Sequence, residues 1–95
     1  MKFEWDLNKE KTNIKKHGIN FEEAKTVFYD INALVIPDPA HSGDEERFVI
    51  LGLSAKTNLL VVWHCYRKND EIIRIINARK ATSTEYSKYN SKKGG

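Results

Sequence analysis

Two apolar strands separated by a short turn constrain this chain more than any other feature. Residues 59–67 spell LLVVWHCYR, the turn Lys-Asn-Asp follows, and residues 71–79 spell EIIRIINAR. Apolar, β-branched runs around polar turn residues are typical of a β-hairpin. Strict alternation in the second strand predicts two faces, with Ile72, Arg74, Ile76 and Ala78 on one and Ile73, Ile75, Asn77 and Arg79 on the other. The hairpin is therefore expected to be a rigid apolar wall that carries positive charge.

The composition limits the class of protein. The 95 residues are enough for one domain with a single core. A hydrophobic share of 40% with 11% aromatics fits a globular chain. The single cysteine, Cys65, excludes a disulfide framework and indicates a reducing compartment. We find no apolar run typical of a signal peptide or a membrane span, and so expect a cytoplasmic protein with no membrane contact.

Charge is distributed unevenly along the chain. Residues 21–46 contain one lysine and seven carboxylates, whereas residues 47–95 contain ten Lys or Arg and three carboxylates. A segregated basic half is typical of a protein that binds a polyanion. The alternative is a solvated face that only keeps the protein in solution.

Local signals predict the remaining elements. A short strand is expected at residues 3–5, and Asp6 and Asn20 are expected to cap two successive helices. Gly18 is expected to end the first helix in a left-handed conformation. Short strands are expected at residues 33–37 and 47–55, with a mobile acidic loop at 38–46 between them. A last helix is expected to open at Thr82.

These elements predict an α+β fold. Two N-terminal helices and a C-terminal helix would pack around an antiparallel sheet of three to four main strands, with the helices against one sheet face. Residues 1–90 would form the single domain, and residues 91–95 a flexible C-terminal tail.

The basic side chains on the strands are the first candidates for a site. Arg47, Arg74, Arg79 and Lys80 begin, occupy or end neighbouring strands, so they could converge on one patch. Guanidinium groups bind phosphate in a bidentate manner and stabilise charge that builds up during phosphoryl transfer. The alternative for Arg47 and Arg74 is a structural ion pair with Glu71 or the acidic loop.

Three further side chains have both a catalytic and a structural interpretation. His64 could transfer protons near neutral pH or be a satisfied core residue. Glu85 could act as a general base, but with Thr82 it also satisfies a capping box. Tyr86, with Tyr89, could stack on RNA bases or pack against the sheet. His41 lies among acidic residues, yet the spacing fits no established metal site, so no metal and no other cofactor is predicted.

Ordered sequence pieces resemble a known family. FEWD, Lys9, Asn13, KHGI and FEEA are followed by VFYD, PDPAHSGDEERF, LGLS, VVWH and RIINARKATSTEY. In this order, over residues 3–89, they resemble the BrnT family of bacterial type II toxins. The resemblance implies a RelE-like fold with one sheet face open to RNA, and a metal-independent ribonuclease that arrests translation. It also implies a BrnA-like ribbon-helix-helix antitoxin, a toxin–antitoxin heterotetramer, and DNA contact only through the antitoxin.

The resulting hypothesis is an endoribonuclease that uses the 2′-hydroxyl of its RNA substrate as nucleophile. Glu85 or His64 would take the proton, Arg74 and Arg79 would neutralise the phosphate, and His64 or Lys80 would assist the leaving oxygen. Arg47, Lys80 and Tyr86 would bind RNA. One alternative is a non-enzymatic basic module that docks an acidic partner or a ribosomal site. A repressor that binds DNA alone is another, although no helix-turn-helix or ribbon-helix-helix pattern is present.

Overall fold

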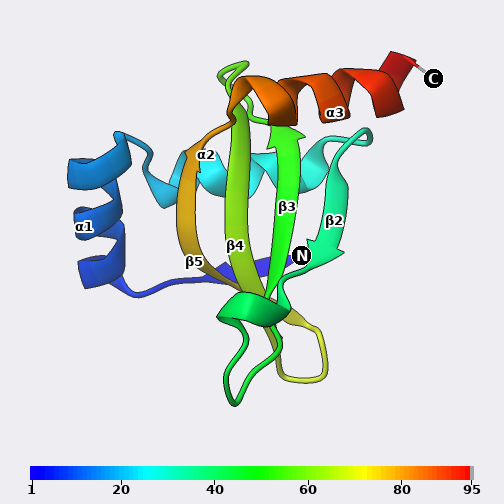
Figure 1. The fold of residues 1–95 in the computed structure, drawn as a ribbon. Coiled ribbons are helices and arrows are strands. Elements are labelled where there is room, and N and C mark those ends of the chain that lie inside the picture. Colours follow the sequence, from blue (N-terminus) through cyan, green and yellow to red (C-terminus); the bar gives the residue numbers. More distant parts are fainter. Residues whose placement is uncertain (95) are drawn as a thin grey trace.

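A five-stranded mixed sheet forms the centre of the protein, as a computed structural model that describes residues 1–94 shows (Figure 1). The strand order is β1-β5-β4-β3-β2. Strand β1 pairs parallel with β5, and every other pair is antiparallel. The strands are β1 (Lys2–Glu4), β2 (Leu34–Pro37), β3 (Phe48–Leu53), β4 (Leu59–Arg67) and β5 (Ile72–Lys80). The α+β class is confirmed, and the sheet is larger than the three to four main strands expected.

The first two helices begin after the predicted caps, and the first ends at the predicted Gly18. They are α1 (Leu7–His17) and α2 (Phe21–Thr26), and α2 continues into a 3-10 turn, η1 (Val27–Tyr29). The Asp6 side chain accepts hydrogen bonds from two backbone N–H groups of α1, and Asn20 accepts one from Glu23. Gly18 ends α1 with φ 71°, a left-handed conformation that glycine adopts without strain. Among the described helices, none combines the length and apolar character that crossing a bilayer requires.

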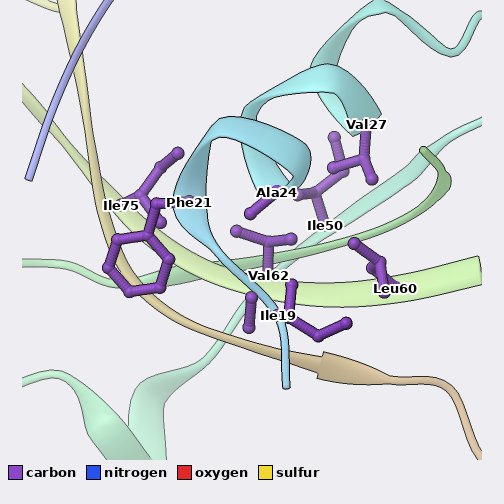
Figure 2. Close-up of a cluster of buried hydrophobic side chains, with 9 residues drawn as sticks. Ile19, Phe21, Ala24, Val27, Ile50, Leu60, Val62 and Ile75 are labelled. Carbon is purple, nitrogen blue, oxygen red and sulfur yellow. The ribbon is translucent and has the colours of Figure 1, made fainter. Parts of the chain in front are cut away.

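Side chains of the central strands point alternately to the two faces of the sheet. Each face has its own cluster of buried side chains. On the α2 face, Val62 and its neighbours contact α2, and the buried cluster is Ile19, Phe21, Ala24, Val27, Ile50, Leu60, Val62, Ile75 and Ala78 (Figure 2). Burying one such large side chain stabilises the fold by ~1.5–3 kcal/mol. On the α3 face, the smaller buried cluster is Leu51, Leu59, Val61 and Tyr89.

The C-terminal helix α3 (Ser83–Gly94) lies on the opposite face from α2. It crosses the sheet near one end of β3 and β4, whereas α2 lies behind the sheet (Figure 1). Tyr89 anchors it, because this side chain is buried and its hydroxyl donates to Asp30 at 2.6 Å. The expectation that all helices share one face is therefore wrong. The residues expected to form a tail from position 91 continue α3 as far as Gly94, and residue 95 lies outside the described residues.

A bulge in β5 changes which residues share a face. Trp63 pairs with Asn77, but His64 pairs with Ile75, so Ile76 has no partner. One extra residue shifts the alternation of side chains by one position. Arg79 pairs with Val61 and Arg74 pairs with Cys65, and both partners lie on the same face of the regular strand β4. The strict alternation predicted for β5 is therefore wrong, and both arginines lie on the α3 face.

Strand β1 covers only part of the β5 edge, and beyond it a side chain of α1 binds the backbone of β5. Asn13, which is buried, donates to the carbonyl of Ala78 and accepts from its N–H, at 2.9 and 3.0 Å. Its amide also donates to the carbonyl of Ile19. The carboxamide thus substitutes for a neighbouring strand, and α1 lies beside β5 (Figure 1).

Candidate functional site

Arg79 and Glu85 form a bidentate ion pair where β5 leads into α3. The two guanidinium nitrogens Nη1 and Nη2 donate to the two carboxylate oxygens at 2.8 and 3.0 Å. Glu85 also accepts from the N–H of Thr82, whose hydroxyl accepts from the N–H of Glu85, so the predicted capping box is present. The Arg79 guanidinium, with help from the Thr82 N–H, lowers the pKa of Glu85 to about 2. Glu85 is therefore a fixed anion that orients Arg79.

The Arg79 guanidinium also lies over an aromatic ring. Its central carbon is 5.3 Å from the centroid of the Trp63 indole, which is a cation–π distance. Nη1 donates to the Lys80 carbonyl as well as to Glu85. Of the five N–H donors of arginine, Nε–H and one Nη2–H then form no hydrogen bond within the described residues. Arg79 is thus held in position with two donors available to an anion.

Asp38 connects the same indole to a histidine. One carboxylate oxygen, Oδ2, accepts from Trp63 Nε1 at 2.8 Å and lies 2.7 Å from His41 Nδ1. The rings of His41 and Trp63 meet edge to face, with centroids 6.3 Å apart. The Trp63 N–H, followed by the contact with His41, lowers the pKa of Asp38. Trp63 therefore has Arg79 over its ring and, at its N–H, the Asp38 carboxylate that also contacts His41.

The loop that carries this pair has a defined structure. Residues Pro39–His41 form a 3-10 turn, η2, and the His41 N–H donates to the Asp38 carbonyl. The Ser42 hydroxyl also donates to that carbonyl and accepts from the N–H of Arg47, which closes the loop. Figure 1 shows η2 near the end of the sheet that α3 leaves uncovered. These hydrogen bonds define the turn that presents His41, and the mobility expected for residues 38–46 stays a prediction.

Arg74 occupies a second position on the α3 face, towards the other end of β5. It pairs with Glu4 at 2.7 Å, and Glu4 also lies 3.8 Å from Arg67. Arg67 in turn pairs with Glu45 at 3.0 Å. At ~3.3 Å per residue, Arg74 and Arg79 are roughly 15 Å apart along the strand. The two arginines thus share a face, but each has its own carboxylate and they form no single cluster.

The predicted RNA-binding residues lie in three different places. Tyr86 is 46% exposed on α3, directly after Glu85. Lys80 pairs with Leu60 and so faces the α2 side of the sheet, away from Arg79. Arg47 precedes β3 and lines a small cavity of about 300 Å³ with Arg67 and the loop residues Gly43, Asp44 and Glu45. Tyr86 and Lys80 thus follow Glu85 and Arg79 in sequence, but the Lys80 side chain points to the opposite sheet face from Arg79.

His64 is buried on the α2 face and is not brought together with the arginines. Its ring lies between Phe28 and Phe48, with centroids 4.8 and 6.1 Å away. Nε2 is 3.2 Å from the Tyr66 hydroxyl, and Nδ1 is 3.3 Å from the Val62 carbonyl. Burial lowers the pKa of His64 to about 4. This environment suits a neutral core histidine.

Sequence reasoning considered His41 and its acidic neighbours only as a metal site, and so missed the Asp38–His41–Trp63 group. Asp38 and His41 are three residues apart, a spacing that brings two side chains together in a 3-10 turn. That spacing was the only available signal, because Trp63 lies on another strand 25 positions from Asp38. Over the described residues, no group of three or more His, Cys, Asp or Glu side chains is arranged to hold a metal ion.

Comparisons with known proteins point to one family. The family model described as "Ribonuclease toxin, BrnT, of type II toxin-antitoxin system" matches residues 5–85. Among solved structures, the chain is similar to the crystal structure of the Brucella abortus ribonuclease toxin BrnT, with 27% identity and a TM-score of 0.68. The match covers 87% of this chain and 99% of that one. A search of curated proteins found no match.

Proposed function

The chain belongs to the BrnT family of ribonuclease toxins of type II toxin–antitoxin systems, and we propose that it cleaves RNA on the α3 face through attack of the substrate's own 2′-hydroxyl, without a metal ion. The observation that carries this proposal is Arg79, which Glu85 and Trp63 hold with two donors available. A guanidinium fixed in this way is suited to a phosphodiester whose negative charge increases in the transition state. Cleavage of RNA in the cytoplasm would inhibit translation.

The proposed reaction is a transesterification. The 2′-oxygen forms a bond to the adjacent phosphorus, and the bond from phosphorus to the 5′-oxygen breaks. A base takes the 2′-hydroxyl proton, and the departing 5′-oxygen acquires a proton. The products are a 2′,3′-cyclic phosphate and a 5′-hydroxyl, so a deoxyribose at the scissile position stops the reaction.

The geometry favours distinct roles for the predicted residues. Glu85 acts on Arg79 as a positioning residue, because a carboxylate with a pKa of about 2 is a poor proton acceptor. Tyr86, the residue after Glu85 on α3, provides an exposed ring for stacking on a base. Arg74, roughly 15 Å along β5, is suited to another phosphate of the same RNA. Burial on the α2 face gives no support for proton transfer by His64.

The family also defines the kind of partner. A type II system includes an antitoxin protein. We propose a BrnA-like antitoxin with a ribbon-helix-helix domain, a toxin–antitoxin heterotetramer, and DNA contact through the antitoxin alone. Co-expression with the neighbouring small open reading frame, followed by size-exclusion chromatography with light scattering, tests both the pairing and its stoichiometry.

A cleavage assay tests the proposed chemistry. Purified protein in EDTA should turn over an excess of single-stranded RNA and leave cyclic-phosphate ends. A matched oligonucleotide with one 2′-deoxyribose should remain intact at that position. The second candidate, a basic binding module, is favoured by the ion pairs that already occupy Arg74 and Arg79. A binding module of this kind would leave RNA uncut, so no new RNA ends would form whether or not the protein binds RNA.

A further inference from the structure

The Asp38–His41 pair has the geometry of a proton-transfer group rather than of a core contact. The His41 side chain is 62% exposed, whereas that of Asp38 is 17% exposed. In the described chain, the side-chain contacts of His41 are confined to Asp38, through Nδ1, and the ring of Trp63. The imidazole is therefore held at one nitrogen, and Nε2 on the other side of the ring has no hydrogen-bond partner among the described residues.

We infer that His41 is the catalytic base that removes the 2′-hydroxyl proton, with Asp38 as its positioning residue. This inference rests on the proposed function and goes further, because it names a base that the sequence did not predict. The carboxylate of Asp38 favours a proton on Nδ1, which leaves the lone pair on Nε2. A base that a third group orients in this way is the arrangement that activates a hydroxyl nucleophile.

Trp63 places the base and the phosphate-binding group on one patch. Its indole lies under Arg79 and contacts His41, and its N–H holds the carboxylate that orients His41. A phosphate bound by Arg79 brings its neighbouring ribose onto the same patch. The 2′-oxygen and the 3′-phosphorus belong to one nucleotide unit, so the base and the guanidinium would act on neighbouring groups of the same nucleotide.

The contrast with His64 separates the catalytic from the structural interpretation. His64 is fully buried, and both of its ring nitrogens lie near polar atoms of the protein. His41 is mostly exposed, and only Nδ1 is occupied. The His41 ring is therefore accessible to a substrate, whereas the His64 ring is not.

Single-turnover cleavage of an RNA oligonucleotide in EDTA tests the inference. His41→Ala and His41→Gln should each lower the rate by ~10²–10⁴-fold, the contribution typical of general acid–base catalysis. Affinity for the same oligonucleotide with a 2′-deoxy scissile position should be unchanged. Added imidazole should restore part of the His41→Ala rate. His17→Ala, which changes a histidine at the end of α1, is the matched control and should cleave like the wild type.

Asp38→Asn tests the positioning role. It removes the charge while it keeps the shape, and it should lower the cleavage rate while affinity for the 2′-deoxy oligonucleotide stays the same. If affinity falls and the rate at saturation does not, Asp38 and His41 bind RNA instead, and the inference is overturned.

A substrate with sulfur in place of the leaving 5′-oxygen separates base from acid. A thiolate leaves without protonation, so loss of a base should slow this substrate as much as the normal one. If the His41→Ala defect disappears, His41 protonates the leaving group, and its assignment as base is overturned. If the His41→Ala variant cleaves RNA as fast as the wild type does, only the inference is overturned. A wild type that makes no cyclic-phosphate ends overturns the proposed function and the inference together.

Discussion

Arg79 lies over the indole of Trp63, 5.3 Å from its centroid, because β5 contains one residue more than regular pairing allows. Without the unpaired Ile76, positions 74 and 79 would point to opposite faces. The bulge brings both arginines to the α3 face, and α3 supplies Glu85 to only one of them. Arg79 thereby differs from an ordinary surface arginine.

We expect Arg79→Lys to lower kcat/KM by ~10²-fold or more, although charge is conserved. A lysine ammonium cannot form the paired hydrogen bonds to Glu85 or stack flat on Trp63. Steady-state cleavage of a fluorescent RNA oligonucleotide is the measurement. Arg67→Lys, on the same sheet face, is the matched control, and an equal loss in both variants would contradict a special role for Arg79.

We expect Glu85→Gln to remove a stabilisation that depends on pH. The pKa of Glu85 falls from 4.5 to about 2 on folding, so its contribution is fully present above pH 4.5 and is lost as the pH falls towards 2. With solvent screening allowed for, the difference from wild type should be ~1 kcal/mol at pH 6 and close to zero near pH 2. Urea unfolding at both pH values measures it. If the difference in the free energy of unfolding is the same at both pH values, packing or helix capping is responsible for it and the charge of Glu85 is not.

Acid should also destabilise the protein through His64. Its pKa is lowered from 6.5 to about 4, so the neutral form is favoured on folding, and stability declines as the pH falls from 6.5 towards 4. The loss from this group should be ~2–3 kcal/mol over that window. NMR of the imidazole resonances should show one histidine that titrates near pH 4. A normal titration of all three would refute the buried, neutral state.

Asn13→Ala should destabilise the fold strongly, because Asn13 is a buried residue of the otherwise polar helix α1. Its carboxamide makes three hydrogen bonds, two of them to the backbone of Ala78 at the edge of β5. Loss of these bonds leaves buried backbone groups without partners and should cost ~2–4 kcal/mol. Chemical denaturation measures the change. Asn8→Ala, at an exposed position of α1, should cost much less.

The sequence determined the local structure by itself. The hairpin, the N-caps Asp6 and Asn20, the left-handed Gly18 and the Thr82–Glu85 capping box all appear as predicted. Each depends on residues at most a few positions apart, where backbone sterics and short side chains decide the outcome. The composition likewise favoured a globular chain with a basic half.

Only the tertiary structure decided which side chains meet. The unpaired Ile76, the placement of α3 opposite α2 and the Asp38–Trp63 hydrogen bond depend on registers between segments far apart in sequence. A change of one residue in such a register moves a side chain to the other face, and no local pattern encodes it. For this reason the basic residues could be named as site candidates in advance, whereas the grouping of His41 with Asp38 and Trp63 could not.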